Sequence, residues 1–145
     1  MTGITQDAAD LAEDARRLLV ELDHDVPGVA ALTAECRPPL DVLETASALE
    51  IVVDVPGVAA TSIRVAIRRS TLLVVGAKVA PSTDPERRYH VAERSYGRFA
   101  RAVRLTGAVD ATRARATATG GELRIVLPRL EDRRGSVFSI AVEPA

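Results

Sequence analysis

The sequence contains no tryptophan, two phenylalanines, two tyrosines and one cysteine in 145 residues. With so few aromatic rings, the chain lacks the stacking platforms of single-strand nucleic-acid binders. A single cysteine, Cys36, cannot form an intrachain disulfide or a cysteine cage for a metal ion, and it favours a reducing, cytoplasmic location. No apolar run approaches the roughly 20 residues that cross a bilayer. The acidic N-terminus is not expected to act as a secretory signal.

The composition is that of an ordinary soluble domain, with 47% hydrophobic and 27% charged residues. The net charge is −1, but it is unevenly spread. Residues 1–60 carry 12 acidic and 3 basic side chains, whereas residues 61–145 carry 8 acidic and 16 basic ones. Such asymmetry can mark a nucleic-acid surface, or two parts of one chain or of neighbouring chains that attract each other. The scarcity of aromatic residues favours the second interpretation.

Residues 5–26 are predicted to form a helix that belongs to an N-terminal arm. Apolar side chains recur every three or four residues and form one stripe: Ile4, Ala8, Leu11, Ala15, Leu18 and Leu22. Acidic side chains crowd the early turns, where the helix dipole favours negative charge, and Pro27-Gly28 ends the pattern. The stripe fits a helix packed on its own domain or an arm that pairs between subunits.

Beyond a proline-rich linker, the hydrophobic period changes to two. Short apolar segments alternate with polar residues or run continuously at 49–55, 63–67, 72–75, 99–105 and 123–127. This pattern predicts an all-β, immunoglobulin-like antiparallel sandwich of about seven to nine strands. Turns are expected at Pro56-Gly57, Arg69-Ser70 and Gly120-Gly121. Four glycines are expected at turns or strand ends, where backbone freedom is needed: Gly57, Gly76, Gly97 and Gly121.

Two further segments could supply extra strands. A long polar stretch lies between Lys78 and Gly97, and loops of this length inside a compact β domain are usually functional. Within it, Tyr89, His90 and Val91 are predicted to form a short strand. Past Gly135, the apolar residues of the C-terminal tail alternate, which is typical of a strand that pairs with another sheet edge: Phe138, Ile140 and Val142.

Several motifs follow one another in order between Pro39 and Val142. The first is a strand with a PG turn at Asp54–Val58, and the second is an L-x-I-x-G strand with Leu72, Val74 and Gly76. A G-x-F-x-R-x-x-x-L segment follows, with Gly97, Phe99, Arg101 and Leu105. The last two are an A-x-x-x-x-G-x-L segment with Ala116, Gly121 and Leu123, and an I-x-I-like tail with Ile140 and Val142. In this order, the motifs resemble the small heat-shock proteins, the α-crystallin domain family.

The resemblance implies an arm over residues 1–38, an α-crystallin sandwich over 39–130 and a tail over 131–145. It implies an ATP-independent holdase that needs no cofactor and binds partly unfolded proteins. The strand at Tyr89, His90 and Val91 would cross to a partner's edge near Asp41–Glu44 and make a dimer. Ile140 and Val142 would dock in a neighbour's groove and build a homo-oligomer from dimers. One wall of that groove is expected to be Ile63, Val65 and Ile67.

Arg101 is expected on the apolar face of its strand, next to Phe99 and Val103. A buried arginine must be paired, and the resemblance suggests a structural ion pair at or near the dimer interface. We therefore expect Arg101 to be a structural or dimer-interface residue.

Enzymatic chemistry has little support in the sequence. The only histidines are His24, in an acidic surface cluster of the arm, and His90, in the predicted exchanged strand. Neither is expected in the rigid pocket that a catalytic histidine needs. We expect no metal site, and Cys36 is interpreted as a bystander thiol. No phosphate-binding G-x-x-x-x-G-K-[ST] motif is present.

Two other functions remain open. A CS-like protein-interaction or adaptor module shares the sandwich but needs neither the exchanged strand nor the tail motif. An arginine-rich nucleic-acid binder would show salt-sensitive binding to DNA or RNA. We expect contact with neither membranes nor nucleic acids.

Overall fold

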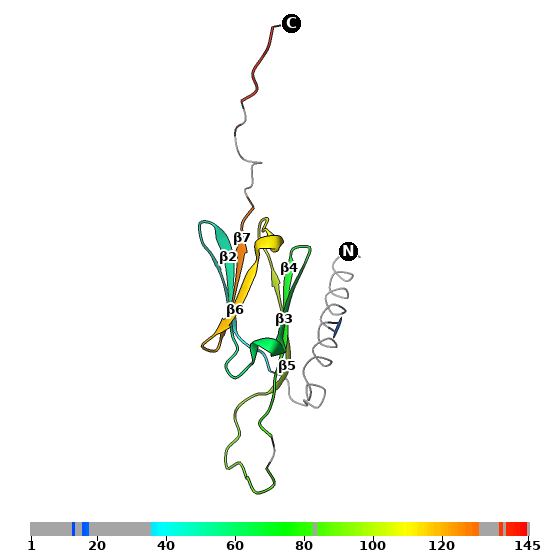
Figure 1. The fold of residues 1–145 in the computed structure, drawn as a ribbon, viewed down its shortest axis with the longest axis vertical. Helices are drawn as coiled ribbons and strands as arrows, with labels where there is room; N and C mark the ends of the chain where they lie inside the picture. Colours follow the sequence, from blue (N-terminus) through cyan, green and yellow to red (C-terminus); the bar gives the residue numbers. More distant parts are fainter. Residues whose placement is uncertain are drawn as a thin grey trace.

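The computed structural model describes residues 13, 16, 17, 36–82, 84–130, 137 and 139–144. These residues form two antiparallel sheets packed face to face (Figure 1). One sheet has the strand order β1-β2-β7-β6 and the other the order β3-β4-β5. The strands are β1 (Leu40–Glu44), β2 (Ala48–Asp54), β3 (Ile63–Arg68), β4 (Thr71–Lys78), β5 (Gly97–Arg104), β6 (Arg115–Thr119) and β7 (Glu122–Pro128). The predicted all-β sandwich is confirmed.

Alternating apolar side chains build the core between the sheets. In β2, for example, Leu49, Ile51 and Val53 are buried, because successive residues of a strand point to opposite faces. The register of β2 with β7 places Ile51 opposite Ile125, and β-branched residues pack well on such a pleated surface. The buried cluster also takes Leu72 and Val74 from β4, and Phe99, Val103 and Leu105 from β5 and the residue that follows it.

The connections follow the predicted turn residues. Gly120 and Gly121 have φ values of 61° and 82° and form the two-residue link between β6 and β7. Two positive φ angles suit a hairpin turn whose twist matches its strands. Gly57 has φ 76° in the turn after β2, and Arg69, with φ 55°, lies in the short link between β3 and β4.

Gly76 differs from its prediction, because it lies inside β4 and not at a strand end. It pairs with Ile63 on β3 and Phe99 on β5. A methyl group at Gly76 would lie 2.4 Å from Cζ of Phe99 and 2.8 Å from the carbonyl oxygen of Ser62. Glycine is therefore needed here for the close approach of an aromatic ring and not for backbone freedom.

The two sides of the sandwich are closed differently. On one side, the segment Cys36–Pro39 bridges the two sheets from β5 to β2. At one end, the Cys36 N–H donates to the Arg98 carbonyl at 3.4 Å, and at the other end the Asp54 N–H donates to the Pro39 carbonyl at 3.0 Å. On the other side, β3 and β6 are the outermost strands of their sheets. Two short 3-10 turns, η2 (Ala60–Ser62) and η3 (Ala111–Arg113), precede these two strands.

The loop over 79–96 projects beyond one end of the sheets, and the C-terminal end of the chain lies beyond the opposite end (Figure 1). The predicted helix over 5–26 falls outside the described residues except for Glu13, Arg16 and Arg17, so it stays a prediction. No helix in the part of the chain that the structure describes is long and apolar enough to span a membrane.

Candidate functional site

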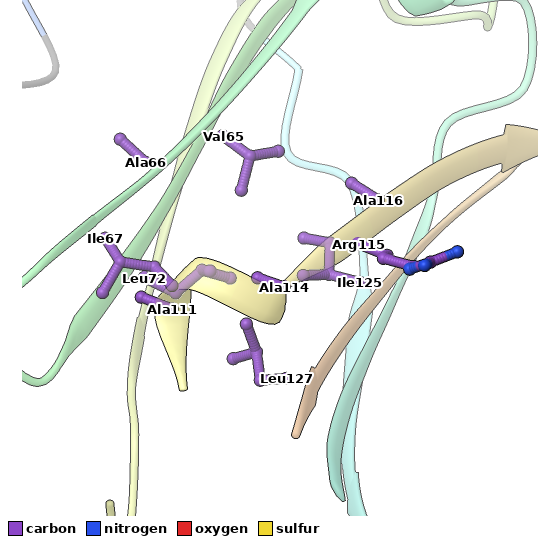
Figure 2. Close-up of a pocket in the computed structure, with 10 residues that line it drawn as sticks. All are labelled: Val65, Ala66, Ile67, Leu72, Ala111, Ala114, Arg115, Ala116, Ile125 and Leu127. Atoms are coloured by element: carbon purple, nitrogen blue, oxygen red, sulfur yellow. The ribbon is translucent and has the colours of Figure 1, made fainter. Parts of the chain in front are cut away.

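An apolar groove opens between the edge strands β3 and β6. Its volume is about 320 Å³, and aliphatic side chains make up almost all of its lining. Figure 2 shows the β3 side chains Val65, Ala66 and Ile67 on one side of the view and Arg115 and Ala116 of β6 on the other. The lining residues are Val65, Ala66, Ile67, Leu72, Ala111, Ala114, Arg115, Ala116, Ile125 and Leu127.

The three β3 residues that were predicted for a tail-binding groove lie in two different places. Val65 and Ile67 line the groove, and both are partly exposed. Ile63 does not, because it is only 8% exposed and belongs to the core cluster between the sheets. Ile63 precedes Val65 by two residues and lies on the same face of β3, at a point where the two sheets are packed together.

The opposite wall was not predicted from the sequence. Its small side chains are Ala111 on η3, Ala114 between η3 and β6, and Ala116 on β6. Small side chains leave space between the sheet edges that larger ones would fill. The signal that could have located this wall is the alanine-rich stretch just before the Gly120-Gly121 turn.

Asp110 holds the η3 part of this wall in place. Its carboxylate accepts hydrogen bonds from the Thr112 N–H at 3.1 Å and from the Thr112 hydroxyl at 2.6 Å. The hydrogen bond from the Thr112 hydroxyl, helped by the nearby positive charge of Arg113, lowers the pKa of Asp110. The turn is therefore capped by an ionised carboxylate at neutral pH.

The groove is suited to binding an extended apolar segment and not to bond-making chemistry. Among its lining residues, Arg115 alone is charged. Edge strands offer unpaired backbone N–H and C=O groups to an incoming strand. In the ranges that the structure describes, no group of three or more His, Cys, Asp or Glu side chains could hold a metal ion.

The tail residues predicted to fill such a groove are exposed in this chain. Ile140 and Val142 are 88% and 95% exposed, so they do not occupy the groove of their own chain. Phe138 lies outside the described residues. The tail therefore exposes two apolar side chains to solvent, spaced as on one face of a strand.

The predicted exchanged strand is also exposed. Tyr89 and Val91 are 63% and 71% exposed, and His90 is exposed beside them. These residues lie in the loop and not in a strand of this chain. The base of the loop is held by Tyr96, whose ring lies 5.2 Å from the Arg94 guanidinium and 5.6 Å from the Lys78 ammonium, within cation–π range.

Arg101 lies on the predicted face of β5, and within the chain it bonds to a backbone carbonyl. The ion pair at or near the dimer interface stays a prediction. The position of Arg101 in register with Val74 places it on the side of the core. It is partly exposed, and its Nη1 donates a 2.7 Å hydrogen bond to the carbonyl of Pro38. Within the chain, Arg101 therefore ties β5 to the segment that closes this side of the sandwich.

Cys36 belongs to the same closing segment. Its thiol donates to the Gly97 carbonyl at 3.4 Å. Burial raises the pKa of the Cys36 thiol, and the positive charge of Lys78 opposes this shift only in part. The neutral thiol that results is a poor nucleophile, in keeping with the interpretation as a bystander.

Comparison with known proteins agrees with this arrangement. A model described as the Hsp20/alpha crystallin family matches residues 41–143. Small heat shock protein C4 of Rickettsia felis is 30% identical over 104 residues, which cover 72% of this chain and 64% of that protein. Heat shock protein 16 of Schizosaccharomyces pombe is 29% identical over 126 residues, covering 84% and 82% of the two chains.

Solved structures show the same architecture. The structure of heat shock protein 16.0 from Schizosaccharomyces pombe matches with a TM-score of 0.63 and 28% identity, covering 75% of this chain and all of that one. The match to the Rickettsia protein covers 64% of its length, so this chain spans just under two thirds of that relative.

Proposed function

The chain belongs to the Hsp20/alpha crystallin family of non-enzymatic chaperones, and from this premise we propose that it is an ATP-independent holdase. It binds partly unfolded proteins and prevents their aggregation, with no bond made or broken. The proposed organisation is an arm over 1–38, the sandwich over 39–130 and a tail over 131–145.

The observation that carries this proposal is the pairing of an open apolar groove with an exposed apolar tail. Val65 and Ile67 face alanines across the groove, while Ile140 and Val142 are solvent-exposed in the same chain. We propose that the tail of one subunit occupies the groove of a neighbour. A vacated groove then offers apolar surface and free strand edges to a partly unfolded chain.

The energetics favour reversible docking. Burying Ile140 and Val142 contributes roughly 1.5–3 kcal/mol each, whereas ordering each tail residue costs roughly 1–2 kcal/mol. A single docked tail is therefore weak. Several tails on one assembly act together through their high effective concentration, so the oligomer holds together while individual grooves open.

A second contact would build the dimer. We propose that Tyr89, His90 and Val91 pair as a strand with β1 of a partner. Support comes from the position of β1 as an outermost strand of its sheet, with Val42 and Leu43 exposed on it. Strand addition to such an edge supplies backbone hydrogen bonds and buries apolar side chains.

The decisive experiment compares the intact chain with the double variant Ile140→Ser/Val142→Ser. We expect the variant to lose oligomer mass in light scattering and to protect a model client from aggregation less well, in assays without ATP. Val137→Ser is the matched control, because Val137 is equally exposed but precedes the motif.

The same experiment separates the alternatives. Unchanged mass in the double variant would refute tail docking. An intact chain that fails to suppress client aggregation would refute the holdase and favour the CS-like adaptor module.

A further inference from the structure

Two positively charged side chains meet at the turn that follows β2. A methyl group at Gly57 would lie 3.4 Å from Cε of Lys78 and 3.9 Å from Nη2 of Arg94, so both side chains reach the same point of the surface. Both also lie close to the ring of Tyr96, at 5.6 and 5.2 Å from its centroid. Lys78 is the last residue of β4, and Arg94 lies at the far end of the loop over 79–96. The turn therefore gathers cations from both ends of that loop, and we call them the Lys78–Arg94 pair.

No carboxylate neutralises the Lys78–Arg94 pair in the ranges that the structure describes. The ion pairs of those ranges join other residues, and the ring of Tyr96 is the contact that both cations make. Glu93, the acidic neighbour of Arg94, is exposed and pairs with neither cation. A cation–π contact holds a cation in place but leaves its charge, and like charges at close range repel each other. The pair therefore favours an anion, and it matches one that carries two negative charges.

An apolar cavity adjoins this pair. Its volume is about 330 Å³, and its lining includes Lys78 and Pro56, the residue before Gly57. Prolines and valines form most of its apolar wall, together with one aromatic ring: Pro38, Pro39, Val55, Pro56, Val58 and Phe99. Apolar walls with a few polar groups are typical of sites for small organic ligands.

The polar part of the lining adds donors but no net negative charge. Ser95 contributes a hydroxyl, which can donate to an anionic oxygen. Arg37 and Asp54 bring one charge of each sign, so the positive excess of the Lys78–Arg94 pair remains. Cys36 also lines the cavity. Burial raises the pKa of its thiol and the positive charge of Lys78 opposes that shift, so this thiol lies within the field of the site.

We propose that the Lys78–Arg94 pair and the adjoining cavity bind a small organic phosphate monoester. The phosphate group lies between the two cations, and the organic part occupies the cavity. A phosphate monoester carries a charge of about −1.5 to −2 at pH 7, which matches two cations, whereas a carboxylate neutralises only one. The guanidinium of Arg94 can donate two parallel hydrogen bonds to phosphate oxygens, and the ammonium of Lys78 acts as a point charge.

Binding has a mechanical consequence for the loop over 79–96. Lys78 immediately precedes the loop and Arg94 lies on its return, so one anion held by both ties the two ends together. A bound phosphate monoester therefore restricts the orientation of the loop and of Tyr89, His90 and Val91 within it. Its effect on assembly rests on the dimer contact proposed above, whereas the site itself does not.

The test titrates the full chain with phenyl phosphate in a calorimeter, at constant ionic strength with chloride as the other anion. The site variant is Lys78→Gln/Arg94→Gln. We expect it to weaken binding roughly tenfold or more, as the loss of charge-assisted contacts predicts. Arg87→Gln/Arg104→Gln is the matched control, because it removes two positive charges from exposed residues outside the cavity lining. It should bind phenyl phosphate as the parent chain does.

Two further ligands separate the contributions of charge and cavity. Inorganic phosphate should bind roughly tenfold more weakly than phenyl phosphate, because it buries no apolar surface in the cavity. Benzoate, with a similar ring but a single charge, should also bind more weakly. Equal binding of inorganic phosphate would overturn the assignment of the cavity to an organic part, and equal binding of benzoate would overturn the assignment of the pair to a phosphate group.

The thiol of Cys36 gives a readout in the parent chain that needs no variant. Bound phenyl phosphate should slow its alkylation by iodoacetamide, because the ligand fills the cavity and neutralises Lys78. Sodium chloride at the same ionic strength should not. Unchanged alkylation at saturating phenyl phosphate means that the ligand binds elsewhere. Equal weakening in the site variant and its control assigns binding to net charge, and the absence of saturable binding to the parent chain overturns the site altogether.

Discussion

At the scale of single residues, Arg101 closes one side of the sandwich by reaching a backbone carbonyl. Replacing Arg101 with alanine leaves the Pro38 carbonyl without its charged donor. Since charged hydrogen bonds contribute about 1.5–3 kcal/mol and this side chain is partly exposed, we expect a loss of about 1–2 kcal/mol of unfolding free energy. Calorimetry and light scattering measure the melting temperature and the oligomer mass.

Arg104→Ala is the control for this prediction, because Arg104 lies on the same strand but is exposed. We expect it to change neither quantity. If Arg101→Ala retains both the melting temperature and the mass of the parent chain, the closing role assigned to Arg101 is wrong.

Gly76 makes a second prediction at this scale. Gly76→Ala forces a methyl group against the Phe99 ring and the Ser62 carbonyl. Overpacking of this kind costs about 1–3 kcal/mol, which denaturant unfolding would detect as a lower midpoint. Gly120→Ala is the comparison, because a methyl group there meets nothing within 4 Å and only the positive φ is strained. Equal effects of the two substitutions would contradict the close-approach explanation.

Sequence patterns identified the face of Arg101 but not its partner. Period-two alternation places Arg101 with Phe99 and Val103, and the need for a partner follows from the burial of a charge. The carbonyl that it contacts belongs to Pro38, 63 residues earlier. Nothing in the local sequence encodes that approach, because it depends on how the linker crosses between the sheets.

At the scale of elements, the groove depends on the small residues of η3 and β6. Ala116→Glu places a carboxylate in an apolar wall, and burying that charge under a docked tail is unfavourable. We expect the variant to fold normally, because Ala116 is exposed, but to form lighter oligomers in light scattering.

Thr117→Glu adds the same charge one residue further along β6, on the other face of the strand. It should leave the oligomer mass as in the parent chain. A similar loss of mass in both variants would show that charge on β6, and not occupation of the groove, controls assembly.

The two walls of the groove differ in how far the sequence predicts them. Alternation of Val65 and Ile67 with Arg64 and Arg68 predicts the β3 strand, and the family resemblance implies that this strand forms one wall of a groove. The η3 and β6 wall is a run of alanine, threonine and arginine without a hydrophobic period, and all five residues of β6 are exposed. Its role arises only when β6 pairs with β7 and thereby faces β3 across the opening.

At the scale of the whole molecule, the sandwich has one side closed by its own chain and several edges left for other chains. The structure shows a closed core and a segment, Cys36–Pro39, that covers one side. Among the described residues, Tyr89 and Val91 of the loop and Ile140 and Val142 of the tail are exposed. Stability of the fold and assembly are therefore expected to respond to different substitutions.

This separation predicts a stepwise assembly that can be dismantled one contact at a time. In the tail variant Ile140→Ser/Val142→Ser, the loop contact remains, so we expect a dimer with twice the 15.4 kDa mass of one chain. Adding Val91→Asp places a charge in the exchanged strand, where pairing would bury it, and should yield the monomer. Circular dichroism should show the same β content throughout, because Val91 lies outside the core.

Val79→Asp provides the comparison at the start of the same loop, since Val79 is also exposed but lies outside the predicted strand. Combined with the tail variant, it should leave the dimer intact. Sedimentation or light scattering at matched concentrations distinguishes the three species. A dimer that survives Val91→Asp would place the subunit contact elsewhere, whereas a monomer already present in the tail variant would mean that the loop contact depends on the docked tails.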